Sequence, residues 1–144
     1  CPLLANCLPD LDVPMKDKPV SLQLEIIPET LAVVRLEPNE QVPDWALKSK
    51  FFSISRTSDE LSIVTEASNV PMGLKVESGW RAFKVAGPLD FSLTGILAAL
   101  ATPLAQAKVS IFAISTFDTD YVLVKERNLS LATQTLATNG HHIK

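Results

Sequence analysis

One pattern occurs twice in this chain, and it constrains the fold more than any other feature of the sequence. Residues 51–66 (FFSISRTSDELSIVTE) align without a gap with residues 111–126 (IFAISTFDTDYVLVKE). The matches include Phe52 with Phe112, Ile54 with Ile114 and the carboxylates Glu60 and Asp120. Each copy alternates apolar and polar residues around a polar turn, which is typical of a β-hairpin. Two copies predict a chain built from two similar units.

The elements around the first hairpin are short. Apolar and polar residues alternate in Ser21–Ile27, and Leu31–Leu36 is a short, mostly apolar run, so each segment predicts a strand. Residues 44–49 allow only a short helix, and the cluster Val-Pro-Met-Gly at 70–73 predicts a boundary between units. We therefore divide the chain into an irregular leader at 1–19, a first unit at 20–73 and a second unit at 74–144.

The second unit has fuller helices. Trp80–Ala86 alternates like a strand, and leucines and isoleucines recur at helical spacing from Leu93 to Leu104. Asn128 is expected to cap a second helix, and Ile143 to begin a short last strand. The order β-α-β-β-α-β is the ferredoxin-like pattern. The predicted fold is α+β, with two such units in tandem, antiparallel sheets, helices on one face and reduced helices in the first unit.

Composition excludes several classes of function. The net charge is −3 and Lys and Arg do not cluster, so nucleic-acid binding is not expected. No apolar run reaches ~18 residues, the length that would span a membrane. Cys1 and Cys7 have no neighbouring histidine pair, so neither a metal nor a cofactor is expected. His141 and His142 are predicted to lie in a solvated tail, and no G-x-S-x-G motif is present, so we expect no enzyme. The expected compartment is the cytoplasm.

The turn of the second hairpin is one candidate site. Thr116, Phe117, Asp118, Thr119 and Asp120 place an aromatic ring and two carboxylates at a strand tip, which suits an ammonium group. The same residue types also favour turns, because their side chains bond the nearby backbone. The sequence leaves both interpretations open.

The start of the long helix is the other candidate. Leu93, Thr94, Gly95 and Ile96 lie where backbone N–H groups are unpaired, and a carboxylate can bind at such a helix end. A glycine there is equally consistent with close packing of the helix against a strand.

The run from Thr94-Gly95-Ile96 to VSIFAISTFDTDYVLVKERNLSLATQTLA resembles tandem ACT-domain proteins of the CASTOR-like type. The resemblance covers about residues 31–140 and implies regulation by a bound amino acid rather than catalysis. In that family one unit supplies strand residues to the ligand, and the other supplies a helix start and a turn. Ser110 and Ile111 match the strand part, and Thr116, Phe117, Thr119 and Asp120 match the turn. The resemblance therefore implies a homodimer with shared sites, and a protein partner not yet identified.

One position departs from the family pattern. Relatives often carry an acidic residue two places before the helix glycine, and here it is Leu93. An apolar residue cannot neutralise a guanidinium, so the resemblance implies a neutral or apolar amino acid rather than arginine. Asp120 would hold the ammonium group, with Phe117 and Leu93 around the side chain. The alternative function is an assembly module that has lost its ligand and acts through sheet edges.

Overall fold

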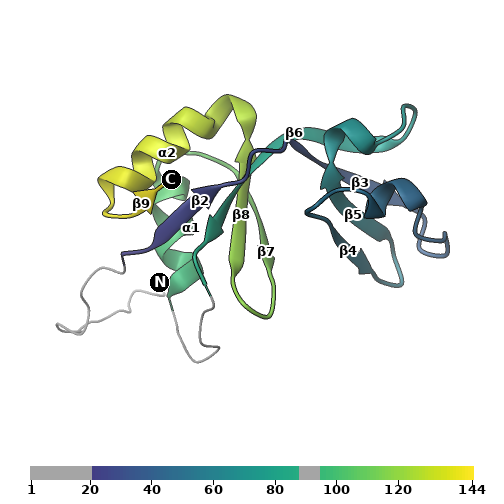
Figure 1. Ribbon diagram of the computed structural model, residues 1–144, viewed down its shortest axis with the longest axis horizontal. Helices are drawn as coiled ribbons and strands as arrows, with labels where there is room; N and C mark the ends of the chain where they lie inside the picture. Colours follow the sequence, from purple (N-terminus) through teal and green to yellow (C-terminus); the bar gives the residue numbers. More distant parts are fainter. Residues whose placement is uncertain (1–20, 88–94) are drawn as a thin grey trace.

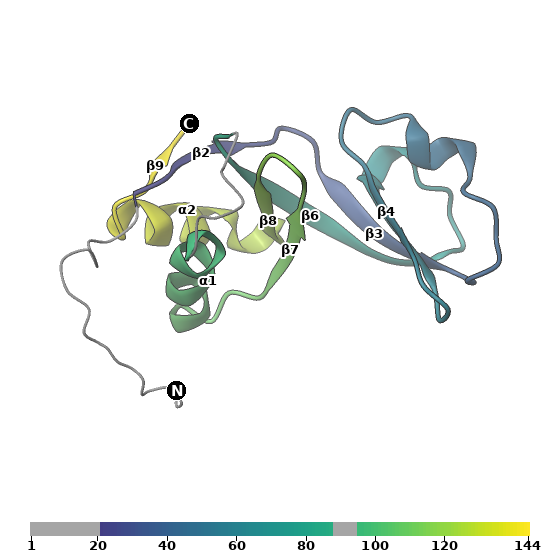
Figure 2. The ribbon, with the colours of Figure 1, turned by 90° about the horizontal axis from the view of Figure 1, so that it is seen from below.

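The computed structural model describes residues 21–87 and 95–144. Within these residues, eight strands form one hydrogen-bonded sheet, and the two α-helices lie at one end of it (Figures 1 and 2). The elements, of which η2, η3 and η4 are short 3-10 helices, are in chain order β2 (Gln23–Ile26), β3 (Leu31–Leu36), η2 (Asp44–Leu47), β4 (Ser53–Arg56), β5 (Leu61–Glu66), η3 (Ala67–Asn69), β6 (Lys75–Val85), α1 (Ile96–Gln106), β7 (Ile111–Ser115), β8 (Asp120–Lys125), η4 (Glu126–Asn128), α2 (Leu129–Thr138) and β9 (His142–Ile143).

The long strand β6 joins two units of this sheet. Its first half pairs with β3, and its second half lies between β2 and β8. The first unit has the strand order β4-β5-β3-β6, and the second has the order β7-β8-β6-β2-β9. Both follow the ferredoxin-like arrangement, so the predicted α+β, ferredoxin-like fold is confirmed. The predicted separate sheets are wrong, because β6 extends beyond Trp80–Ala86 and pairs in both units.

Strand β2 lies in the second unit, although it precedes the first unit in the chain. Leu24 pairs with Val85 on one side and, in parallel, with Ile143 on the other. A strand pattern predicts where a strand is but not which strand it pairs with. The division at residue 73 stays a prediction. Strand β2 precedes that position in the chain but pairs with β6 and β9 of the second unit. The leader at 1–19, with Cys1 and Cys7, lies outside the described residues.

Three apolar clusters stabilise the fold, one in each unit and one between the units. The helices α1 and α2 cover one face of the second unit, where Phe83, Leu100 and Leu136 are fully buried. In the first unit, the short η2 packs through Ala46 on the face of the sheet that points away from the second unit. The third cluster lies between the units and contains Leu31, Val64, Trp80 and Leu123, with Phe112 packed against it. Each fully buried aliphatic or aromatic side chain stabilises the fold by about 1.5–3 kcal/mol.

The hairpin repeat is present, but its period is 59 residues rather than sixty. In the first turn Thr57 N donates to the Glu60 carbonyl at 2.9 Å, and in the second Thr116 N donates to the Thr119 carbonyl at 2.8 Å. The strand registers agree with this shift, since Ser53 pairs with Val64 and Phe112 with Leu123. The ungapped alignment is therefore wrong by one residue, which exchanges the two faces of a strand. The structural counterpart of Asp120 is Leu61, not Glu60.

Candidate functional site

The turn between β7 and β8 is held by its two threonines. The Thr116 hydroxyl donates to the Thr119 carbonyl at 3.0 Å and accepts from Thr119 N at 3.2 Å. Thr119 is buried, and its own hydroxyl donates to the Val85 carbonyl at the end of β6, at 2.6 Å. Both hydroxyls thus stabilise the turn, as the turn-chemistry interpretation expects. This leaves Phe117, Asp118 and Asp120 as the side chains of the turn that a ligand could contact.

Asp120 is the best-placed acid of the turn. It opens β8 opposite Ser115, whose hydroxyl donates to Asp120 Oδ1 at 2.6 Å. Because side chains alternate along a strand, Asp120 lies on the same face as Val122, which packs in the core under α1 and α2. Its Oδ2 has no hydrogen-bond donor among residues 21–87 and 95–144. The adjacent Phe117 is 79% exposed, and Asp118 is also exposed.

The start of α1 also lies in the second unit, on the helix-covered face of its sheet. Gly95 adopts a left-handed conformation with φ 79°, and its carbonyl accepts the first helical bond from Ala99 N at 2.9 Å. A Cβ at Gly95 would meet no atom within 4 Å. The positive φ rather than close packing therefore explains this glycine. Ile96 packs against the core, so only its backbone N–H is available, and Leu93 and Thr94 lie outside the described residues.

Ser110 and Ile111 lie at the opposite end of β7 from the turn. Ile111 pairs with Val124, whereas Ser115 pairs with Asp120 beside the turn. At about 3.3 Å per residue, some 13 Å separate Ile111 from Ser115. The Ile111 side chain packs against the core under the helices. Within one copy of the chain, the predicted strand part and turn part of the site are therefore apart.

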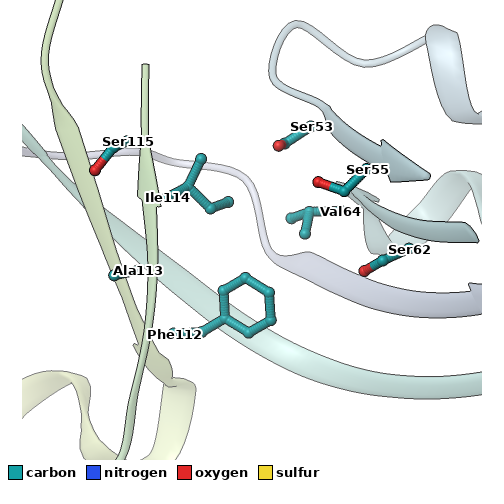
Figure 3. Close-up of a pocket in the computed structure, with 8 residues that line it drawn as sticks. All are labelled: Ser53, Ser55, Ser62, Val64, Phe112, Ala113, Ile114 and Ser115. Carbon is teal, nitrogen blue, oxygen red and sulfur yellow. The ribbon is translucent and has the colours of Figure 1, made fainter. Parts of the chain in front are cut away.

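A cleft between the two units was not predicted from the sequence. It has a volume of about 340 Å³ and lies between the hairpin β4–β5 and the strand β7 (Figure 3). Phe112 and Ile114 point toward the first unit, while Ser53 and Ser55 point toward β7. The alternation Ser-Ile-Ser in β4 indicates a strand with a polar face. It does not indicate that this face meets another sheet.

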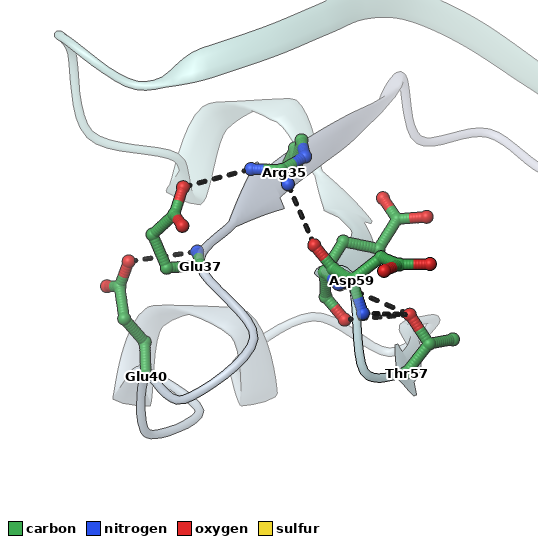
Figure 4. A network of polar contacts seen from close by, with 6 residues as sticks. Arg35, Glu37, Glu40, Thr57 and Asp59 are labelled. Carbon is green, nitrogen blue, oxygen red and sulfur yellow. Dashed lines mark hydrogen bonds and ion pairs between the residues drawn. The ribbon is translucent and has the colours of Figure 1, made fainter.

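Hydrogen bonds within the first unit hold the turn between β4 and β5. Arg35 Nη1 lies 3.1 Å from Glu37 Oε2, and its Nη2 donates to the Asp59 carbonyl at 2.8 Å (Figure 4). Thr57 Oγ1 accepts from Asp59 N at 3.1 Å. Arg56 donates to the carbonyls of Pro38 and Glu40. These contacts give the first hairpin a structural role.

The C-terminal histidines differ from each other, and the predicted solvated tail is wrong for the first. His141 is buried, because its Nδ1 accepts from Leu22 N at 3.2 Å and its Nε2 lies 3.1 Å from the Ala99 carbonyl. Only His142 is exposed. Leu22, directly before β2 in the segment that the sequence assigned to the first unit, supplies one partner of the buried ring.

Residues 21–87 and 95–144 contain no group of three or more His, Cys, Asp or Glu side chains that could hold a metal ion. Nor does this part of the chain contain a helix long and apolar enough to cross a membrane.

Comparison with known proteins agrees with this architecture. The sequence model of the ACT domain matches residues 75–138, and a model described only as an N-terminal domain matches residues 29–73. The protein Atu0741 of Agobacterium tumefaciens is 38% identical, and its crystal structure superposes with a TM-score of 0.83 over 87% of this chain and 93% of that one. The chain belongs to the ACT-domain family.

Two curated relatives narrow the type of ACT protein. The bovine cytosolic arginine sensor for mTORC1 subunit 1 is 36% identical over 94 residues, which are 60% of this chain and 29% of the sensor. Human CASTOR3P is 29% identical over 106 residues, which are 63% of this chain and 64% of CASTOR3P. The predicted CASTOR-like type is confirmed. This ACT protein spans less than two thirds of either relative.

Proposed function

We propose that this ACT protein is a non-catalytic cytosolic regulator that binds a free amino acid between the second units of two copies. The family and the named sensing role of the arginine sensor support the ligand class. The observation that carries the proposal is the open edge of β7. Among the described residues β7 pairs only with β8, so its other edge can pair with a second copy.

An antiparallel pair of β7 strands would complete the site. A register centred on Ala113 sets Ile111 of one copy opposite Ser115 of the other. The Ser110–Ile111 backbone of one copy then lies beside Asp120 and the turn of its neighbour. Two equivalent sites result, as a two-fold interface requires. This accounts for why the two parts of the predicted site lie at opposite ends of β7 within one chain.

In this site each group has a distinct role. Asp120, oriented by Ser115, pairs with the ligand's ammonium group through its remaining oxygen. The backbone N–H groups at Gly95–Ile96 and at Ser110–Ile111 of the other copy hold its carboxylate. Phe117, at the exposed tip of the turn, covers the ligand side chain. With Leu93 at the position where relatives carry an acid, a neutral amino acid fits better than arginine.

Thermal denaturation with each of the twenty amino acids at millimolar concentration tests this proposal. A ligand at about 100 times its Kd stabilises the folded protein by about 2.7 kcal/mol. Asp120→Asn keeps the shape and the bond from Ser115 but removes the charge, so it should abolish the shift. Asp59 in the first turn is the counterpart of Asp118 in the second, and Asp59→Asn should leave the shift unchanged.

The assembly module is the alternative. It predicts dimers whose melting temperature responds to none of the twenty amino acids, in the wild type as in Asp120→Asn. Such a result would refute the sensing proposal while leaving the role of the β7 edge intact.

A further inference from the structure

The cleft between the units has walls of opposite character. Under the 59-residue period, Ser53 is the counterpart of Phe112 and Ser55 of Ile114, so equivalent strands of the two units supply the walls of the cleft. One wall therefore presents hydroxyl groups and the other an aromatic ring and a branched side chain. If this contact served only to join the units, apolar residues on both walls would be expected to close it. Instead, three serines line the wall of the first unit beside Val64, a member of the apolar cluster between the units.

Three of the four serines that line the cleft have no hydrogen-bond partner for their hydroxyl groups in the described part of the chain. Within residues 21–87 and 95–144, no hydrogen bond is made by the side chains of Ser53, Ser55 or Ser62. Ser115, by contrast, points away from the gap in Figure 3 and donates to Asp120. A hydroxyl group can donate one hydrogen bond and accept two. The cleft thus offers three convergent polar groups beside an apolar surface, as small-molecule sites do.

None of the residues that line the cleft is charged. A carboxylate or ammonium group placed there would lose its hydration without gaining a counter-ion, which is unfavourable. A free amino acid carries both charges and therefore does not fit. The volume, about 340 Å³, lies at the small end of the range for ligand sites.

We propose that this cleft binds an uncharged ring compound that carries an amide-like polar edge. Its ring packs against Phe112 and Ile114, and its carbonyl and N–H groups bond the hydroxyls of Ser53, Ser55 and Ser62. Phe112 and Ile114 point to the opposite face of β7 from Ala113 and Ser115. Asp120, on which the proposed amino-acid site depends, lies on the face of Ala113 and Ser115 and does not line the cleft, although Ser115 borders both sites. A ligand in the cleft contacts both units and fixes their relative position.

Benzamide and benzoate form a matched pair of probes, since they have nearly the same shape and differ in charge. Titration of the full chain, followed by ¹H–¹⁵N correlation spectra, should shift the signals of 53–64 and 112–115 with benzamide. Benzoate should bind at least about tenfold more weakly than benzamide, because its carboxylate has no partner in the cleft. Equal affinity for the two probes, or benzamide shifts confined to other residues, would overturn the proposal.

Two double variants test the hydroxyl groups directly. Replacing Ser53 and Ser62 by alanine should weaken benzamide binding about tenfold, because two hydrogen bonds are lost. Replacing Ser68 and Ser130, which are exposed and lie outside the cleft, should leave the affinity unchanged. If the cleft variant keeps a native spectrum and binds benzamide as the wild type does, the assigned site is wrong.

Discussion

Thr119 shows how a single side chain can tie the turn to the rest of the second unit. Its counterpart in the first unit is Glu60, which is only partly buried. Thr119 is 5% exposed, and its hydroxyl bonds the Val85 carbonyl at 2.6 Å. This bond connects the turn with the end of β6, the segment that leads toward α1. The position of Asp120, the next residue, depends on this connection.

Thr119→Val should therefore destabilise the protein by about 1–3 kcal/mol, because the Val85 carbonyl would be left buried without a donor. Thr138→Val makes the same chemical change at an exposed position near the C-terminus and should alter stability by less than about 0.5 kcal/mol. Urea denaturation of both variants measures the difference. Similar stability of the two variants would mean that the hydroxyl of Thr119 does not support the turn.

At the scale of elements, His141 connects three segments that are distant in the sequence. It links Leu22, directly before β2, with Ala99 of α1, and it directly precedes β9. The neighbouring backbone adds to this connection, since His142 N donates to the Leu22 carbonyl at 2.8 Å. A buried ring with a partner at each nitrogen is a structural group.

His141→Ala should lower the free energy of unfolding by about 2 kcal/mol or more, since it removes buried packing and leaves Leu22 N without its acceptor. His142→Ala changes the adjacent, exposed histidine and should have an effect below about 0.5 kcal/mol. Chemical denaturation of the pair distinguishes this account from a solvated tail, for which both changes would be nearly neutral.

The positions of single strands and helices were predicted from the sequence more accurately than the contacts between them. Leu31–Leu36 is a strand with the predicted bounds, and the last short strand includes Ile143, because alternation and turn residues act locally. Asn128 does precede α2, but its side chain makes no capping bond. The partner of β2, the one-residue shift of the repeat and the cleft could not be predicted, since each depends on contacts between distant segments. The turn and the helix start stay predicted parts of the candidate site. The sequence left open whether Thr116 and Thr119 contact a ligand or stabilise the turn, and their hydrogen bonds show that they stabilise the turn.

At the scale of the whole molecule, β6 makes the two units parts of one sheet. Its first half belongs to the first unit and its second half to the second. The hairpin β7–β8 therefore has two different environments. One face carries Asp120 beside the helices, the other faces the serines of β4 and β5, and the edge of β7 is open. The two proposed ligand sites, at the edge of β7 and in the cleft, would thus use different surfaces of the same hairpin.

The central claim is that each amino-acid site is shared between two copies, and mixing two inactive variants tests it most directly. Asp120→Asn removes the turn carboxylate, and Ser110→Pro removes a backbone donor at the other end of β7. Each variant alone should fail to bind the amino acid identified in the thermal screen. A one-to-one mixture should recover roughly a quarter of the wild-type sites, because half the dimers are mixed and each has one intact site. Mixed dimers that form but show no binding by calorimetry would contradict the shared site.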